Sequence, residues 1–230
     1  MAASMESTAA VPQPSLDLDR DSTTEVMLIR HGRSADVVPG TTEAQDPGLH
    51  PLGRQQADAL ASRLAGKTIH AIYSSHLKRA IETAQVLADP RALPIGVYED
   101  LQEVLMGDWG NGEFRRRAAV RDPQWLAWAA SGRWDGIPGG EGDDALRSRV
   151  SQVVRELAAR HVGDTIAVVA HGGAINACVA DIFGIERTLW MSCENTSITT
   201  LRVTAERTMV LGANDCSHLY DAVLGEPGRP

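Results

Sequence analysis

Short apolar runs alternate along the chain with longer segments in which apolar residues recur every three or four positions. The apolar runs predict strands at 26–29, 69–75, 95–99, 165–170, 197–203 and 208–212. The recurrent pattern predicts helices at 51–65, 77–89, 144–161 and 173–184. A further helical segment, 113–132, is expected in two pieces because Pro123 interrupts it.

The order of these elements predicts an α/β fold. Strands that alternate with helices form a largely parallel sheet with helices on both faces, which is a three-layer α/β/α sandwich. The last two strands are joined by too few residues for a crossover, so we expect them to form an antiparallel edge. Ligands in such sheets bind beyond the carboxyl ends of the strands.

A single domain over residues 25–221 fits this pattern, because no linker rich in Pro, Gly or Ser and no repeat divides it. The length of 230 residues suits one sizeable core. Residues 1–24 are small, polar and Pro-containing, which predicts a disordered leader, and residues 222–230 predict a flexible tail. The leader lacks the basic start and apolar stretch of a secretory signal.

Charge and cysteine content narrow the functional classes. The formal net charge of −8 argues against a partner with a nucleic-acid or anionic membrane surface, since both select basic proteins. No apolar run approaches the roughly 20 residues of a membrane span. The three widely spaced cysteines indicate reduced thiols and a cytoplasmic location. Oligomeric state is left open, with a homodimer as one option.

Cations and imidazoles follow the strands at three places. Arg30 and His31 follow the first strand directly, and His171 and Gly172 follow strand 165–170. Arg79 lies one turn into the helix after strand 69–75. Each feature alone is weak, and Arg79 by itself would more often be a solvated helical charge. Their shared position predicts one pocket for a dianion, to which a helix start opened by glycine adds backbone N–H groups.

These segments resemble the histidine phosphatase superfamily, the phosphoglycerate-mutase-like (branch 1) group. "LIRHGRS" resembles its Arg-His-Gly signature, "YSSHLKRAIETA" its Ser-x-x-x-Arg-Ala segment, and "VVAHGG" its second histidine. Three more segments match in the family's order: "LHPLGRQQADAL", "LQEVLMGDWGNGEF" and "PGGEGDDALRSRV". The resemblance implies a phosphoglycerate-mutase-like fold and a metal-independent phosphatase that acts on a small phosphorylated substrate without a cofactor.

If the protein is a phosphatase of this kind, the chemistry of its residues indicates a role for each. An imidazole can attack phosphorus without first losing a proton, so His31 is the expected nucleophile and would form a phosphohistidine. The phosphoryl oxygens would be bound by Arg30, Arg79, His171 and Gly172. His171 would either donate a proton or carry positive charge, and is counted among the catalytic residues.

A proton donor for the leaving group is also needed. Glu103 is the expected donor on the strength of the motif match, with Asp108 in reserve. We find no His-x-x-x-His pair or cluster of carboxylates that would hold a metal.

The chain departs from the family pattern near the nucleophile. An Asn that contacts phosphate in many relatives is missing near 36–38. Arg33 and Ser34 are possible further contacts, although Arg33 could equally point to solvent. Residues 113–140 are expected to pass over the pocket. Trp125 and Trp128 would pack that segment onto the sheet, with contact to the organic part of the substrate as the alternative. Arg115, Arg116 and Arg117 would form a solvated face, with contact to a substrate carboxylate or second phosphate as the alternative.

Two other functions remain open. A phosphoglycerate-type mutase uses the same phosphohistidine, although we see no longer insertion after Glu103 of the kind that encloses a bisphosphate. A non-catalytic phospho-ligand binder could keep the fold. The sequence leaves the substrate among sugar phosphates, nucleotides, phosphoglycerates and phosphoserine.

Overall fold

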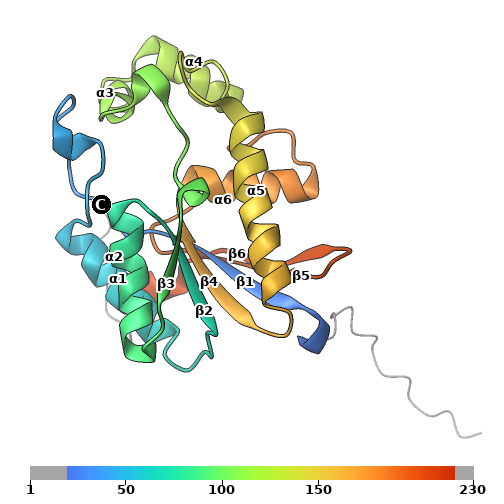
Figure 1. The fold of residues 1–230 in the computed structure, drawn as a ribbon. Helices are drawn as coiled ribbons and strands as arrows, with labels where there is room; N and C mark the ends of the chain where they lie inside the picture. The colour runs from blue at the N-terminus through green and yellow to red at the C-terminus, as the bar shows by residue number, and fades with distance from the viewer. Residues whose placement is uncertain (1–19, 221–230) are drawn as a thin grey trace, which may run out of the picture.

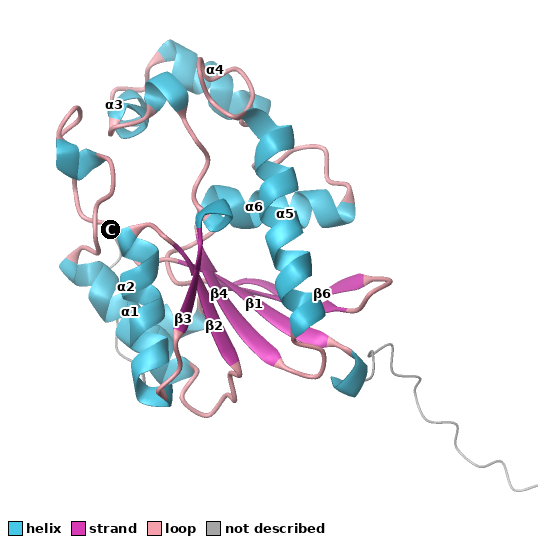
Figure 2. Cartoon of the chain, viewed as in Figure 1, coloured by secondary structure: helices cyan, strands magenta, loops and turns pink. Residues whose placement is uncertain are grey.

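A six-stranded sheet forms the centre of the protein, whose computed structural model describes residues 20–220. The strand order is β3-β2-β4-β1-β5-β6 (Figures 1 and 2). The four parallel strands are β1 (Thr24–Arg30), β2 (Ala71–Ser75), β3 (Ile95–Tyr98) and β4 (Thr165–Ala170). Next to β1, β5 (Ile198–Val203) runs antiparallel, and β6 (Thr208–Asp215) pairs antiparallel with β5.

Helices cover both faces of this sheet. On one face lie α1 (Pro51–Arg63) and α2 (Lys78–Ala88), and on the other lie α5 (Gly142–Arg160) and α6 (Gly172–Phe183). Alternate residues of β1 point to opposite faces. Met27 and Ile29 therefore join the core under α1 and α2, whereas Val26 and Leu28 join the core under α5 and α6. Each fully buried aliphatic side chain stabilises the fold by roughly 1.5–3 kcal/mol.

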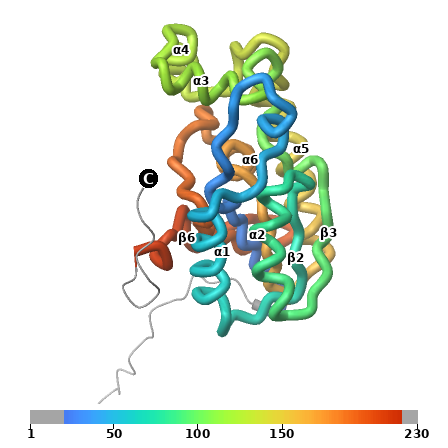
Figure 3. The backbone as a smooth tube through the Cα atoms, turned by 90° about the vertical axis from the view of Figure 1, so that its left-hand side faces the viewer, coloured from blue at the N-terminus to red at the C-terminus, as the bar shows by residue number. Residues whose placement is uncertain are grey.

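Two short helices stand beyond the carboxyl end of the parallel strands. They are α3 (Glu113–Ala119) and α4 (Pro123–Ser131), at the top of Figure 1 and of the rotated view in Figure 3. Pro123 occupies the first turn of α4, and the Asp122 carboxylate accepts hydrogen bonds from the Gln124 and Trp125 N–H groups. The predicted break in this segment is therefore confirmed, because proline suits a helix start and aspartate caps it.

Six 3₁₀ turns complete the described elements: η1 (Arg20–Ser22), η2 (Thr42–Ala44), η3 (Asp89–Arg91), η4 (Glu99–Leu101), η5 (Gly107–Trp109) and η6 (Ser217–Leu219). Residues 20–24, assigned to the leader by sequence, instead form η1 and the start of β1. The reason is bonding to a distant part of the chain, since the Thr24 hydroxyl contacts the Ala158 and His161 carbonyl oxygens at 2.6 and 2.9 Å. The rest of the leader and residues 221–230 lie outside the described residues.

The predicted fold class is confirmed, and element ends account for the differences. The helix expected from residue 144 begins at Gly142, and β6 continues to Asp215 rather than ending at 212. None of the helices within residues 20–220 combines the length and apolar character needed to cross a membrane.

Candidate active site

His31 lies at the carboxyl end of β1, held by its backbone. Its N–H donates to the Ala170 carbonyl at 3.0 Å, which ties the ends of β1 and β4 together. The next residue, Gly32, passes so close to α1 that a Cβ atom there would lie 2.5 Å from the Gly53 carbonyl oxygen. The Arg-His-Gly sequence therefore needs its glycine for a close backbone approach.

The ring of His31 has a fixed tautomer. Its Nδ1 lies 2.6 Å from the Gly32 carbonyl oxygen, which can only accept, so Nδ1 carries the proton. Nε2 therefore keeps a lone pair, to which Arg79 Nε donates at 3.2 Å. Burial, followed by the charges of Arg79 and Arg30, holds the pKa of His31 well below its usual value. A neutral imidazole held in this way has one nitrogen available for attack.

His171 faces His31, as the sequence requires of a single pocket. The ring centroids are 4.9 Å apart, and the planes meet at 57°. His171 follows β4 and is wholly buried, and its Nε2 lies 2.9 Å from the Ser75 hydroxyl. Burial and the neighbouring His31 and Arg79 hold the pKa of His171 well below its usual value. This shift favours the neutral form of His171 near neutral pH.

Two guanidinium groups lie beside these rings. Arg79, near the start of α2, has a side chain that is 12% exposed, and burial lowers its pKa while Glu103 and Asp46 partly offset that effect. Arg30 donates from one terminal nitrogen to the Cys193 carbonyl. Its Nε is buried and has no partner within residues 20–220, and a Cβ on Gly172 would lie 3.5 Å from it. The predicted set of Arg30, Arg79, His171 and Gly172 thus lies together.

Glu103 reaches the same place from the loop after η4. Its Oε2 accepts from the Gly173 N–H at 3.3 Å, and its Oε1 accepts from its neighbour's N–H, that of Val104, at 3.0 Å. The loop is held from behind by Arg149, which donates to the Glu103 carbonyl at 3.1 Å and pairs with Glu141 at 2.6 Å.

A hollow of about 390 Å³ opens beside Arg79 and Glu103. Apolar side chains line much of it: Leu77, Val104, Leu105, Met106, Trp109 and Phe114. Arg115 also lines it. Asp108, by contrast, is exposed and borders an adjoining hollow, which shares Gly110 and Asn111 with the first. The structure thus brings Glu103, and not Asp108, to the arginine.

The other residues proposed from the sequence, Arg33 and Ser34, lie in different surroundings. Arg33 pairs with the exposed Asp36 at 3.3 Å, which holds its charge at the surface. The Ser34 hydroxyl accepts from Arg115 at 2.9 Å, and Arg115 also donates to the Ala35 carbonyl at 3.0 Å. Arg115 is exposed, as expected of a solvated face, and these hydrogen bonds hold it beside the hollow.

The two arginines that follow Arg115 do not line the hollow. Arg116 and Arg117 both pair with Glu113, and the Arg117 guanidinium lies 5.1 Å from the centre of the Trp109 ring.

The tryptophan-rich segment packs mainly on itself. Trp128 and Trp134 have ring centroids 4.9 Å apart, and Phe114 lies 5.1 Å from Trp128. Trp125 packs against the same cluster. Trp125 and Trp128 thus pack within this segment, and their expected packing onto the sheet stays a prediction.

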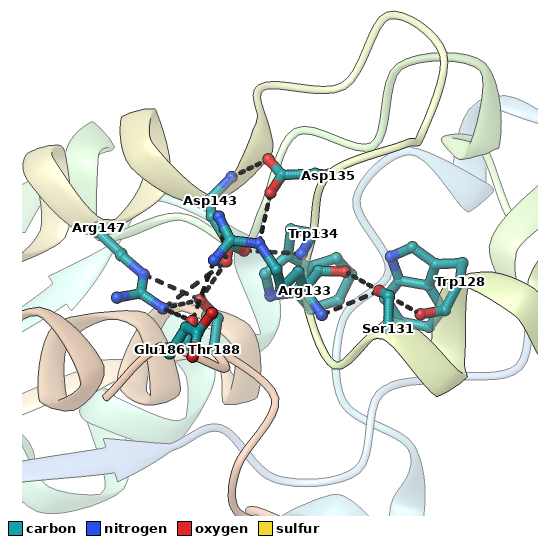
Figure 4. A network of polar contacts seen from close by, with 9 residues as sticks. All are labelled: Trp128, Ser131, Arg133, Trp134, Asp135, Asp143, Arg147, Glu186 and Thr188. Carbon is teal, nitrogen blue, oxygen red and sulfur yellow. Dashed lines mark hydrogen bonds and ion pairs between the residues drawn. The ribbon is translucent and has the colours of Figure 1, made fainter. Parts of the chain in front are cut away.

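A buried carboxylate fastens this segment to the rest of the fold (Figure 4). Asp143 is fully buried and accepts from the Trp134 N–H and the Thr188 hydroxyl, both at 2.7 Å. Arg133 and Arg147 lie 3.4 and 3.7 Å from the same carboxylate. A buried carboxylate with these partners keeps Trp134 in place.

Sequence reasoning assigned no role to three residues that contact the site. Thr83 accepts from the Gly32 N–H at 3.0 Å, and Asn195 donates to the His31 carbonyl at 2.9 Å. Ser75 contacts His171. Ser75 and Thr83 belong to the segment "YSSHLKRAIETA", and its resemblance to the family could have identified both residues from the sequence. Asn195 gives no such signal, because it comes from a loop far along the chain. Within residues 20–220, no group of three His, Cys, Asp or Glu side chains is arranged to hold a metal ion.

Comparison with known sequences gives a family and several similar proteins. A family model described as "Histidine phosphatase superfamily (branch 1)" matches residues 26–216. The metal-independent phosphoserine phosphatase of Arabidopsis thaliana is 31% identical over 202 residues, which covers 85% of this chain and 83% of the relative. The glucosyl-3-phosphoglycerate phosphatase of Mycolicibacterium vanbaalenii is 31% identical over 173 residues, covering 72% and 76%.

A solved structure resembles the fold over nearly its whole length. Phosphoserine phosphatase from Entamoeba histolytica, in complex with 3-phosphoglyceric acid, superposes with a TM-score of 0.69 at 27% sequence identity. The match covers 85% of this chain and 99% of that one.

Proposed function

Because the chain belongs to the histidine phosphatase superfamily (branch 1), we propose that it hydrolyses a small phosphate monoester through a phosphohistidine on His31. The observation that carries the proposal is the geometry of His31, whose Nε2 accepts from Arg79 Nε at 3.2 Å and whose ring faces a second buried imidazole. A neutral nitrogen nucleophile among buried cations suits attack on an anionic phosphoryl group.

In the first step, His31 Nε2 forms a bond to phosphorus while the bond from phosphorus to the leaving oxygen breaks. Glu103 gives its proton to that oxygen, which departs as an alcohol. The Gly32 carbonyl keeps its hydrogen bond to Nδ1 and stabilises the positive charge that develops on the ring.

In the second step, water attacks the phosphohistidine. Glu103, now a carboxylate, takes a proton from the water, and the bond from phosphorus to Nε2 breaks. Inorganic phosphate leaves, and both His31 and Glu103 return to their starting states. One carboxyl group thus serves as acid and then as base.

Charge neutralisation supports both steps. Arg30 and Arg79 hold the phosphoryl oxygens, and two unit charges ~4 Å apart interact by about 4 kcal/mol at an effective dielectric near 20. Because both guanidinium groups are already in place before the substrate binds, little reorganisation opposes the transfer.

Substrates of modest size fit the surroundings. The hollow beside Arg79 combines apolar walls with the Arg115 cation. The relatives are named for phosphoserine and glucosyl-3-phosphoglycerate, both small phosphorylated metabolites. We therefore propose a small phosphometabolite, and prefer hydrolysis to transfer between positions of one substrate.

The test is a phosphate-release screen over phosphometabolites, joined to trapping of the intermediate. Brief reaction followed by alkaline quench should leave acid-labile phosphate on the wild-type chain and none on His31→Ala. Conversion of 3-phosphoglycerate to its isomer without release of phosphate would instead indicate a mutase. Absence of both turnover and labelled protein across the panel would indicate a binding protein.

A further inference from the structure

Ser75 is the last residue of β2, and its hydroxyl contacts the Nε2 side of the His171 ring. The serine and the histidine are both fully buried. The Ser75 hydroxyl lies 2.9 Å from His171 Nε2, and it also accepts from the Leu77 N–H at 3.3 Å. The opposite nitrogen, His171 Nδ1, is buried and has no partner within the described part of the chain.

These contacts decide where the protons lie. A hydroxyl has one proton to donate and lone pairs to accept with. Since Leu77 uses a lone pair of Ser75, the hydroxyl proton needs an acceptor, and His171 Nε2 is the acceptor in contact. If Nε2 carried the proton instead, the buried hydroxyl proton would be left without an acceptor, at a cost of about 1–3 kcal/mol.

We propose that Ser75 is a positioning residue that fixes His171 in its neutral Nδ1–H tautomer, so that this imidazole donates a hydrogen bond to a phosphoryl oxygen without carrying a charge. The inference rests on the proposed phosphatase function. Nδ1 is the nitrogen left without a protein partner, so a donor there is satisfied when an anion binds.

The neutral state makes the tautomer consequential. An imidazolium has protons on both nitrogens and would donate from Nδ1 whatever Ser75 did. Burial keeps the pKa of His171 well below its usual value, so the ring has one proton and its location must be specified.

The two histidines then carry their proton on the same nitrogen, Nδ1, but the two rings have different roles. In His31 the Gly32 carbonyl accepts from Nδ1–H, which leaves the Nε2 lone pair for attack. In His171 the Ser75 hydroxyl donates to Nε2, which leaves Nδ1–H as the donor. A backbone acceptor thus makes one ring a nucleophile, and a side-chain donor makes the other a hydrogen-bond donor.

The tautomer can be read directly in the full chain without substrate. Two-dimensional ¹H–¹⁵N NMR of ring-labelled histidine, with the His171 signals assigned by their loss in His171→Gln, should show Nδ1 protonated near neutral pH. A wild-type protein with Nε2 protonated overturns the inference. Because this measurement needs no turnover, an inactive chain with the expected tautomer would count against the proposed function and leave the tautomer assignment standing.

The chain offers a matched control next to Ser75. Ser74 is equally buried, but its hydroxyl donates to the Ser75 carbonyl and makes no contact with the histidine in the described structure. Orthovanadate is the probe for anion binding. Ser75→Ala should weaken its binding about tenfold or more, as expected when a hydrogen bond to a charged group is lost, whereas Ser74→Ala should stay within about twofold of wild type.

Turnover gives an independent readout. For Ser75→Ala, kcat should fall more than KM rises, because the donor bonds the phosphoryl group more strongly in the transition state. Ser75→Thr keeps a hydroxyl and should keep both tautomer and vanadate affinity. Wild-type affinity and kcat in a folded Ser75→Ala protein, or equal losses in the Thr and Ala variants, would overturn the role of the hydroxyl. If Ser75→Ala does not fold, the wild-type NMR measurement still decides.

Discussion

The Oε1 atom of Glu103 lies 2.3 Å from the position that a Cβ atom on Gly173 would take. The same glycine donates its N–H to the other carboxylate oxygen at 3.3 Å. Gly173 therefore both holds the carboxylate and leaves the space that it fills. Trp134 closes the far side, since one of its ring carbons would lie 3.0 Å from the same Cβ.

Replacement of Gly173 should impair the proton-transfer step before it impairs the fold. In Gly173→Ala the methyl group would push the Glu103 carboxylate out of reach of the leaving oxygen. We expect kcat for alkyl phosphates to fall about 100-fold, the lower end of what a general acid contributes. The loss for p-nitrophenyl phosphate should be much smaller, because that leaving group needs little protonation.

A matched control for this variant is Gly66→Ala. Nothing lies within 4 Å of a Cβ at Gly66, so the added methyl group should leave both activities unchanged. Equal losses for the two substrates in Gly173→Ala would mean that the methyl group damages the phosphate pocket and not the proton donor.

Glu103→Gln tests the proton donor itself. The amide keeps the size of the side chain but cannot give up a proton to an alkoxide. We expect the same division between leaving groups as for Gly173→Ala, with a larger loss for alkyl phosphates, measured as kcat on each. Asp108→Asn should remain near wild type, because Asp108 borders a different hollow. A reversal of these two results would transfer the role to Asp108.

Position along the strands made much of this site predictable from sequence. Arg30, His31 and His171 follow apolar runs directly, and the carboxyl ends of parallel strands meet at one edge, so their convergence followed from the fold. Glu103 needed the family resemblance, because its loop has no periodic pattern that fixes its direction.

Other contacts depend on packing that no local pattern encodes. A run of three arginines indicates a solvated face, and Arg115 is indeed exposed, but its place beside the hollow could not be read from that run. Asn195 reaches His31 from a segment 164 residues away in sequence. Asp143 bonds the Trp134 backbone, a partner that its place at the start of α5 does not indicate.

Arg115 should favour substrates with a second anionic group. Its guanidinium lines the hollow beside Arg79 and Glu103 and is braced by Ser34 and the Ala35 carbonyl. For Arg115→Gln we expect KM to rise about tenfold for phosphoserine or 3-phosphoglycerate, as expected when a charge-assisted hydrogen bond is lost. KM for p-nitrophenyl phosphate should change little. Arg116→Gln is the control, because Arg116 pairs with Glu113 away from the hollow. Equal effects on all substrates would place Arg115 on the phosphoryl group instead.

The buried imidazoles of His31 and His171 should make stability depend on pH, together with buried His218, whose pKa is also lowered by burial. Burial holds the pKa of His31 and of His171 well below 6.5, the value each has when solvated. Below that pH the unfolded chain binds protons that the folded chain refuses, so the free energy of unfolding falls as pH drops through 6.5. Each ring contributes a slope of up to about 1.4 kcal/mol per pH unit, and none of it above about pH 7.5.

Urea denaturation between pH 5 and 8 measures the slope of the free energy of unfolding against pH. His31→Asn should reduce it, because one of the buried rings is gone, while Ser74→Ala should not. A free energy of unfolding that stays constant down to pH 5, or an unaltered slope in His31→Asn, would mean that these rings already titrate in the folded protein as they do in water.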